Sequence, residues 1–192
     1  MQGFTGPGGT LPVPSLADQV AQFLSSPAPP AASLARPLFV LLGGINDVFA
    51  SPNITAAQSF GVLARLRAQL AAAHPRADVL ALGYPALERI PYDTYAAPAD
   101  KRALRAFSRE ISALWRDAAA ASPGAQAGSG GRVAYAELRP LFADFEYYGA
   151  PADYGFAPLG AYGSCLTGAY GETPSVTLCA DQDEMVYWDE YQ

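Results

Sequence analysis

The sequence predicts an α/β fold built on a parallel sheet. Short apolar segments bounded by Pro or Gly alternate with longer segments whose apolar residues recur at helical spacing. The order strand, helix, strand, helix, strand requires right-handed crossovers, so we expect parallel strands with helices on both faces of the sheet. At 192 residues the chain is long enough for a single domain, 1–192, with a sizeable core.

Three segments have the composition of buried strands. The first is the continuous apolar run of 37–43, which suits a strand buried on both faces. The second is 77–84 and the third is 132–138. Residues 1–14 form a Gly- and Pro-rich lead-in without periodicity. Three strands are few for a sheet of this type, which indicates that an element is missing.

Helical signals lie between these segments. Ser15 precedes Leu16, Val20, Phe23 and Leu24, which share one helical face, and a Ser- and Pro-rich run over 25–30 ends the pattern. Thr55 and Gln58 have capping-box spacing and open a helix that ends near His74, before Pro75. A third helix is expected over 99–121 and a short one over 141–148, and 124–131 has the composition of a flexible loop.

Charge and hydropathy exclude several classes of function. With 12 basic and 18 acidic residues the net charge is −6, so nucleic acid and anionic membranes are not expected partners. No run approaches the roughly 18 apolar residues of a spanning helix, and we expect a soluble protein. Because His74 is the single His, a multi-His metal centre is excluded, and no cofactor is expected.

Cys165 and Cys179 lie in a Gly- and Tyr-rich segment without the spacing of a zinc or redox motif. They are either two unrelated buried thiols or a short-loop disulfide. The disulfide is favoured because Asn53-Ile54-Thr55 is a glycosylation sequon and both features fit a secreted protein. The first residues have no signal-peptide pattern, which conflicts with that setting and indicates a segment missing upstream.

The residues most suited to chemistry follow the first strand. Reactive groups gather at the carboxyl ends of parallel strands, and Gly43-Gly44-Ile45-Asn46-Asp47 stands at such an end. Gly44 permits a tight exit from the strand, and the amide of Asn46 can donate to a developing negative charge. The alternative is that Asn46 and Asp47 only cap the turn.

Taken with this turn and the two cysteines, the final Trp188-Asp189 resembles the SGNH or GDSL hydrolases, especially their fungal secreted lipase and carbohydrate acetylesterase branch. The resemblance runs in order from about residue 13 to the last residue. It includes Leu82-Gly83-Tyr84-Pro85, Arg89-Ile90-Pro91, Tyr154-Gly155-Phe156, Ser164-Cys165-Leu166 and Cys179-Ala180-Asp181.

The resemblance implies a three-layer α/β/α flavodoxin-like sheet with strand order 2-1-3-4-5, of which this chain would lack the first strands. It assigns Asn46 to the oxyanion hole, Gly44 to the supporting turn and Asp189 to the triad acid. The family is secreted and hydrolyses esters, so acyl or acetyl esters on carbohydrate or lipid are the implied substrates.

The chain departs from the family at the nucleophile and the base. It contains no Gly-Asp-Ser, and Gln192 stands three positions after Asp189, where the family has its catalytic His. An amide cannot accept the proton of a hydroxyl nucleophile. His74 is expected at the opposite edge of the sheet from Asn46, where it would act as a helix-terminal or surface residue. We therefore expect the carboxy-terminal two-thirds of such an enzyme, inactive alone.

Two further expectations follow. Without the first strands, the segment 37–43 becomes a sheet edge with unpaired backbone groups and no gatekeeping charge, so self-association through that edge is expected. The rival function is a non-catalytic carbohydrate-binding or interaction module, because several of the 11 Tyr lie between Tyr147 and Tyr191 and could line a glycan groove. The alternative for those tyrosines is packing in the core and loops.

Overall fold

The computed structural model describes residues 2–6, 9–26, 36–51, 53–91, 96–122, 131–168 and 175–189. The chain divides into two compact units. We call 14–84 with 107–137 the sheet unit, and 1–13 with 85–106 and 138–192 the disulfide unit. The expectation of a single domain, 1–192, stays a prediction.

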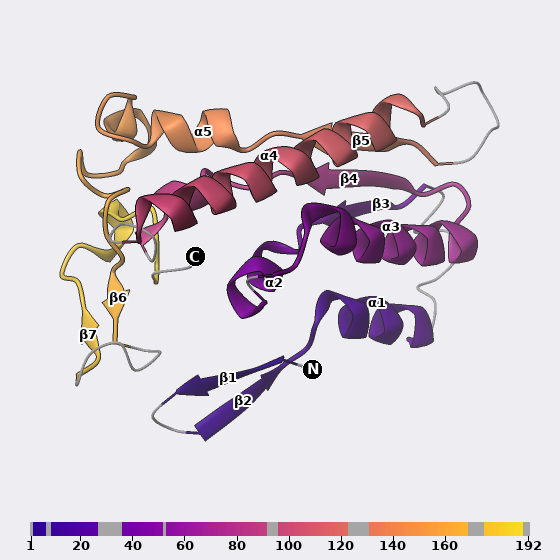
Figure 1. The fold of residues 1–192 in the computed structure, drawn as a ribbon, viewed down its shortest axis with the longest axis horizontal. Helices are drawn as coiled ribbons and strands as arrows, with labels where there is room; N and C mark the ends of the chain where they lie inside the picture. Colours follow the sequence, from indigo (N-terminus) through magenta and orange to yellow (C-terminus); the bar gives the residue numbers. More distant parts are fainter. Residues whose placement is uncertain are drawn as a thin grey trace. The chain divides into compact units, whose positions relative to one another are not determined.

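The sheet unit contains a three-stranded parallel sheet (Figure 1). Its strands are β3 (Leu38–Leu41), β4 (Asp78–Leu82) and β5 (Val133–Ala136), and their order is β3-β4-β5. Phe39 pairs with Val79, which in turn pairs with Val133. The predicted α/β class with a parallel sheet is confirmed, and β3 is an edge of the sheet among the described residues, as expected.

The predicted helices form with the expected caps. They are α1 (Leu16–Ser25), α3 (Ala56–Ala73) and α4 (Pro98–Ala120), and the second part of α4 belongs to the sheet unit. Ser15 with Asp18 and Thr55 with Gln58 each form a capping box, in which side chain and backbone satisfy each other's terminal groups. A short helix, α2 (Ile45–Ala50), follows β3 and was not predicted.

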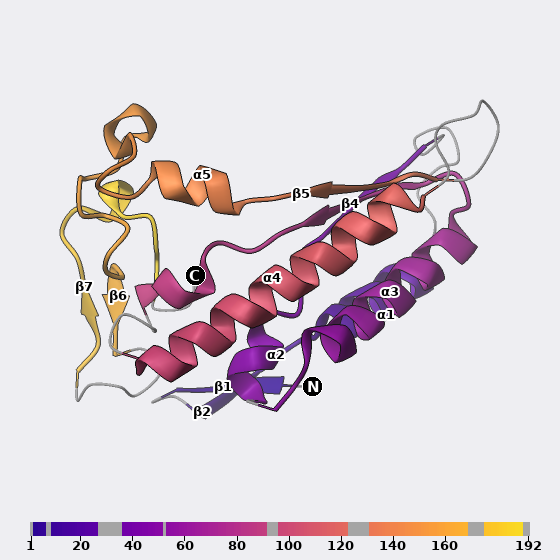
Figure 2. The same ribbon diagram turned by 45° about the horizontal axis from the view of Figure 1, so that its top comes forward.

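The helices of this unit cover one face of the sheet. Phe23 of α1 packs edge-on against Phe39 at a centroid distance of 5.4 Å, and Phe60 of α3 packs against Trp115 of α4 at 5.1 Å. Figures 1 and 2 show α1 beside α3, in agreement with their contacts. Right-handed crossovers between neighbouring strands taken in sequence place both connecting helices on the same face.

The opposite face of the sheet differs from the prediction. Leu38 and Val40 alternate with Phe39 and Leu41 along β3, and they are 59% and 54% exposed. The prediction that β3 is buried on both faces is therefore wrong, and a second helical layer is not present among the described elements of the sheet unit. A continuous apolar run does not report whether the chain supplies a cover for each face.

Asp78 joins the three strands at the amino-terminal edge of the sheet. Its carboxylate accepts hydrogen bonds from Arg36, which precedes β3, and from both the backbone and the side chain of Arg132, which precedes β5. These bonds, those of Arg132 and then Arg36, hold the pKa of Asp78 well below its usual range. The ionised carboxylate therefore helps to align the strand starts.

The disulfide unit is less regular. Its largest sheet is an antiparallel hairpin of β1 (Gln2–Gly6) and β2 (Gly9–Val13), in which Phe4 pairs with Leu11. The interpretation of residues 1–14 as an irregular lead-in is therefore wrong. The strands are rich in β-branched and aromatic residues, but the interspersed Gly and Pro hid the period-two pattern. Only the end of the expected 124–131 loop, Gly131, lies within the described residues.

Short elements make up the rest of this unit (Figure 1). They are the 3-10 helices η2 (Leu87–Arg89), η4 (Pro151–Tyr154) and η5 (Gln182–Glu184), the helix α5 (Arg139–Asp144), and the two-residue strands β6 (Leu166–Thr167) and β7 (Thr177–Leu178). The helix expected over 141–148 exists, but it begins two residues earlier and ends at Asp144. The β6–β7 hairpin was not predicted.

Candidate functional site

The turn after β3 has a fixed backbone. Gly44 has a φ of +92°, in the left-handed region that favours glycine, and it is the N-cap of α2. A Cβ atom at Gly44 would lie 2.5 Å from Ser59 Oγ and 2.7 Å from the Tyr84 hydroxyl oxygen. The Tyr84 hydroxyl also donates to the carbonyl of Gly43. The predicted role of Gly44 in a tight turn is therefore supported by both its conformation and its surroundings.

Asp47 has a structural partner behind this turn. Its Oδ2 accepts a hydrogen bond of 2.7 Å from the hydroxyl of Ser59, which is completely buried in α3. Burial, and secondarily the charge of Asp47, raises the pKa of Tyr84, so the phenol stays protonated and remains a donor. Asp47 thus ties the turn to α3, and the Tyr84 hydroxyl ties Gly43 to the start of the loop after β4.

Asn46 differs from its neighbour. It is exposed in the first turn of α2, and its side chain has no hydrogen-bond partner within the described residues. The sequence left open whether Asn46 and Asp47 both only cap the turn. In the structure Asp47 secures the turn, whereas the amide of Asn46 is available to a ligand at the carboxyl edge of the sheet.

The carboxyl ends of β4 and β5 add polar groups that the sequence analysis missed. Glu137 follows β5, and its Oε2 accepts hydrogen bonds from the Tyr135 hydroxyl at 3.1 Å and from Arg116 at 3.3 Å. Its Oε1 is buried and has no hydrogen-bond partner in the described part of the chain. A Cβ at Gly83 would lie 2.3 Å from the Tyr135 hydroxyl, so the side chain of Tyr135 packs closely against the backbone of Gly83. Because Gly83 and Glu137 fall at the carboxyl ends of the predicted strands 77–84 and 132–138, that placement was the signal that could have found them.

His74 lies away from this edge. It is the C-cap of α3, before β4 begins, and its ring packs between Phe23 and Phe39 at centroid distances of 5.7 and 5.6 Å. It therefore stands at the amino-terminal end of β4, whereas Asn46 follows the carboxyl end of β3. The predicted non-catalytic, helix-terminal role of His74 agrees with this placement.

Asp189 belongs to the disulfide unit, whereas Gly44 and Asn46 belong to the sheet unit. Asp189 is only 5% exposed. The carbonyls that precede it, of Tyr187 and Trp188, accept hydrogen bonds from the amides of Cys165 and Leu166. Burial raises the pKa of Tyr187 to about 12. The segment that carries Asp189 is therefore held against the strand that follows Cys165.

The disulfide between Cys165 and Cys179 is present, which confirms the favoured interpretation of the two cysteines. The two cysteines are also joined by a backbone hydrogen bond of 2.9 Å, from the Cys179 amide to the Cys165 carbonyl. The disulfide closes the β6–β7 hairpin at its base. Because the Asp189 segment pairs with the same strand, the disulfide supports the surroundings of Asp189.

A buried ion cluster stabilises another part of the disulfide unit. The side chain of Glu88 is 5% exposed, and its Oε1 accepts hydrogen bonds from Arg105 of α4 and Arg139 of α5. Burial alone would raise the pKa of Glu88, but its backbone hydrogen bond and the charges of Arg139 and Arg105 outweigh that effect and lower it. Glu88 was not recognised from the sequence, because its partners are distant along the chain.

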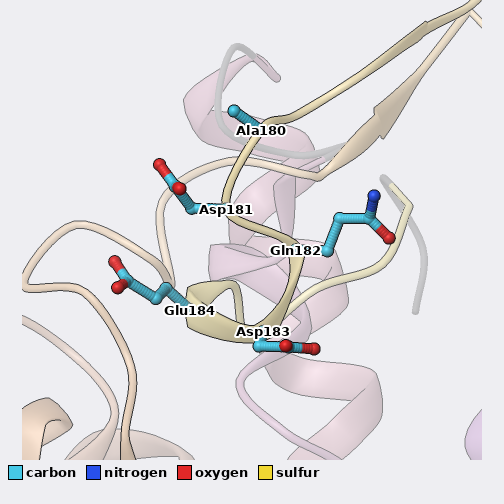
Figure 3. Close-up of a pocket in the computed structure, with 5 residues that line it drawn as sticks. All are labelled: Ala180, Asp181, Gln182, Asp183 and Glu184. Carbon is cyan, nitrogen blue, oxygen red and sulfur yellow. The ribbon is translucent and has the colours of Figure 1, made fainter.

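A pocket of the disulfide unit is lined by Ala180, Asp181, Gln182, Asp183 and Glu184, three of which are acidic. Figure 3 shows the three carboxylates pointing in different directions. No group of three or more His, Cys, Asp or Glu side chains able to hold a metal occurs among the described residues. This pocket therefore does not form a metal centre.

Two other predictions concern the surface. Asn53 of the sequon is exposed, so it is accessible to modification, and its glycosylation stays a prediction. None of the helices in the described ranges is long and apolar enough to cross a membrane.

Comparisons with known proteins identify no family. No protein-family model matches the chain, and no curated protein matches it significantly in sequence.

Proposed function

We propose that the chain carries part of the active site of an SGNH-type ester hydrolase. In this proposal Asn46 donates to the oxyanion, Gly44 shapes the turn that presents Asn46, and Asp189 is the triad acid. The single observation that carries the proposal is the contrast between two neighbouring residues after β3. Asp47 accepts a hydrogen bond from Ser59, whereas the side chain of Asn46 is exposed and has no hydrogen-bond partner within the described residues. An amide donor at the carboxyl edge of a parallel sheet is suited to stabilising negative charge.

The proposed fold is the flavodoxin-like three-layer arrangement. The order β3-β4-β5 with parallel strands is compatible with its last three strands. The exposed edge of β3 and the exposed side chains of Leu38 and Val40 are where further strands and a second helical layer would add. In this interpretation the protein is secreted, consistent with its disulfide and with the exposed sequon.

The proposed chemistry divides the reaction between residues of this chain and two groups that it lacks. A Ser hydroxyl attacks the ester carbonyl while a His accepts its proton, and the carboxylate of Asp189 orients that imidazole. The tetrahedral oxyanion accepts a hydrogen bond from the side-chain amide of Asn46. Burial of Asp189 favours this role, since an orienting carboxylate works best away from water. Acyl or acetyl esters on carbohydrate or lipid are the proposed substrates.

The first test is hydrolysis of p-nitrophenyl acetate. The 192 residues contain neither Gly-Asp-Ser nor a His after Asp189, so the chain alone should not exceed the buffer rate. Turnover by the chain alone that is abolished by Asn46→Ala would overturn the proposal that the Ser nucleophile and the His base lie outside these 192 residues. The encoded flanking sequence is the second test: Gly-Asp-Ser upstream and His-Pro downstream support the proposal, and their absence contradicts it.

A chain extended by those flanking segments allows a quantitative test. Asn46→Ala should lower kcat about 10²- to 10³-fold, as expected for loss of one oxyanion donor. Asp189→Asn should lower it by roughly 10⁴-fold, as expected when the His loses its orienting acid. Asn53→Gln is the matched control, because Asn53 is an exposed Asn outside the proposed site, and it should leave kcat unchanged.

A second candidate function is carbohydrate binding without catalysis. The observation that favours it is the unequal burial of the tyrosines in the disulfide unit. Tyr187 is buried, whereas Tyr147, Tyr148, Tyr154 and Tyr162 are exposed. Thermal stabilisation by a glycan, in a chain that hydrolyses no ester, would select this function.

A further inference from the structure

Exposed tyrosines gather on one turn of the disulfide unit. Tyr147 and Tyr148 follow α5, and their rings stand perpendicular to each other at a centroid distance of 5.1 Å. Tyr148 is 95% exposed, and Tyr147 and Tyr162 are about half exposed. The hydroxyl of Tyr162 accepts a hydrogen bond of 3.1 Å from the backbone amide of Tyr147. We call these three residues the aromatic turn.

The backbone of the aromatic turn is fixed. The amide of Gly149 donates to the carbonyl of Glu146 at 2.8 Å, and the amide of Ala150 donates to that of Asp144 at 2.7 Å. A Cβ at Gly149 would lie 2.5 Å from the Asp144 carbonyl oxygen, so the turn closes only with glycine there. The exposed rings are therefore carried by a preorganised backbone, which reduces the entropy lost when a ligand binds.

Aromatic packing beneath the surface reinforces this turn. Phe145 is buried and makes edge-to-face contacts with Phe142, Tyr154 and Phe156 at centroid distances between 5.0 and 5.3 Å. Phe142 also contacts the buried Tyr187. The unit thus buries Phe145 and Tyr187 and leaves the rings of Tyr147, Tyr148 and Tyr162 exposed. Packing in the core accounts for the aromatic side chains at Phe145 and Tyr187. It does not account for an aromatic side chain at Tyr148, which is almost fully exposed.

The polar groups around the aromatic turn restrict the kind of ligand. Arg89 forms an ion pair with Glu146, so its charge is already neutralised. Asp144 accepts a 3.4 Å hydrogen bond from the Tyr154 hydroxyl, and Asp144 and Asp153 are both exposed. Carboxylates accept hydrogen bonds from hydroxyl groups but repel anions, and the chain as a whole has a net charge of −6.

We infer that the aromatic turn is a binding site for a neutral polysaccharide. The C–H bonds on the flat face of a sugar ring carry partial positive charge and stack on the negative face of an aromatic ring. Tyr148 and Tyr147 provide two such rings at a right angle, and the neighbouring carboxylates accept hydrogen bonds from sugar hydroxyls. The inference deepens the carbohydrate-binding candidate and rests on it. It is independent of ester hydrolysis, which is measured with a substrate that contains no sugar.

The test is depletion of the full chain from solution by three insoluble neutral polysaccharides: cellulose, xylan and chitin. The wild-type chain should bind at least one of them saturably, and soluble oligosaccharides of the same sugar should release it. Tyr148→Ala and Tyr147→Ala should each weaken binding about tenfold or more. Tyr148→Phe keeps the ring and should stay within about threefold of wild type.

Two controls distinguish a loss of specific binding from a loss of folding and from non-specific adsorption. Leu159→Ala removes another exposed apolar side chain of the same unit and should leave binding unchanged, and near-ultraviolet circular dichroism should report the same fold for every variant. The inference is overturned if none of the three polysaccharides depletes the chain. It is equally overturned if both Ala variants bind like wild type, or if anionic polygalacturonate binds as well as the neutral polymers.

Discussion

The sheet unit and the disulfide unit are stabilised in different ways. The core of the sheet unit is formed by many apolar side chains, among them the buried Leu63, Leu66 and Leu70 of α3 and the buried Val79 and Ala81 of β4. The disulfide unit has short elements joined by a few specific connections: the Cys165–Cys179 bond and the Glu88 ion cluster. Because a shared core tolerates the loss of one contact better than a single connection tolerates its own loss, the disulfide unit should be the more sensitive to substitution.

The two tryptophans of the chain allow the unfolding of each unit to be followed separately by fluorescence. Trp115 is buried in the sheet unit, and Trp188 is half exposed in the disulfide unit. A Trp115→Phe background therefore leaves Trp188 as the reporter of the disulfide unit, and a Trp188→Phe background leaves Trp115 as that of the sheet unit.

The largest effect is expected from stripping the partners of Glu88. The double variant Arg105→Met and Arg139→Met leaves a buried carboxylate without counter-charge, and it should lower the free energy of unfolding by about 3–5 kcal/mol. Adding Glu88→Met should recover most of that loss, because an apolar triad of similar volume needs no compensation. Urea unfolding followed by Trp188 fluorescence measures both. A triple variant no more stable than the double would refute the role given to the buried charge.

The same cluster predicts a dependence on pH. Since the folded-state pKa of Glu88 is lowered, its contribution to stability is present above the unfolded value of about 4.3 and is lost as pH falls through the folded value. Unfolding free energies measured from pH 7 down to pH 3 should therefore fall more steeply for wild type than for the Glu88→Met triple variant. Parallel profiles would contradict this prediction.

The disulfide should have the next largest effect. Cys165 and Cys179 are 14 residues apart, and closing a loop of that size stabilises a fold by about 3 kcal/mol through the unfolded state. The Cys165→Ala and Cys179→Ala double variant should show this loss in Trp188 fluorescence. Dithiothreitol should reproduce the loss in wild type and leave the variant unchanged. Equal denaturation midpoints for wild type and variant would show that hairpin pairing alone holds this region.

A smaller effect is expected at the turn of the sheet unit. Gly44→Ala requires a left-handed alanine and places its Cβ against Ser59 and Tyr84, so it should cost about 1–3 kcal/mol in the Trp115 reporter. Gly61→Ala is the matched control, because Gly61 lies inside α3 with open space around it and should gain about 0.5–1 kcal/mol. If the two Gly→Ala changes alter the free energy of unfolding with opposite signs, the loss of stability at Gly44 comes from the turn. A neutral Gly44→Ala would mean that the backbone there adapts.

Sequence patterns predicted the regular elements well. Apolar periodicity, the Ser15 cap and the Thr55–Gln58 capping box placed α1 and α3 to within a few residues, because these signals are local. The apolar runs placed β3, β4 and β5 equally closely. The β1–β2 hairpin was missed because Gly and Pro interrupt its period-two pattern. The six-residue α2 and the two-residue strands β6 and β7 were missed because they hold too few residues to show a period.

The candidate site was predicted less completely. The disulfide was favoured from the secreted setting that the sequon indicates, and it is present. A tight turn at Gly44 was predicted from the local Gly43-Gly44 pair, and Gly44 has a left-handed backbone. The different settings of Asn46 and Asp47 depend on Ser59, twelve residues further along, and the burial of Glu88 depends on Arg139. Such side-chain contacts arise from tertiary packing and leave no mark on the neighbouring sequence. The exposed face of β3 could not be predicted for the same reason.

The smallest effect on stability, and the sharpest test of the sheet unit, is expected at that exposed face. Val40→Lys places a charge on a side chain that is already in water, so the free energy of unfolding should change by less than about 0.5 kcal/mol. Self-association should nevertheless fall, because a lysine on an edge strand opposes pairing with a second chain. Sedimentation velocity over a range of concentrations compares the variant with wild type. Val62→Lys, on the exposed side of α3, is the matched control and should associate like wild type. A wild-type chain that stays monomeric and melts cooperatively at high concentration would mean that β3 does not recruit a second strand.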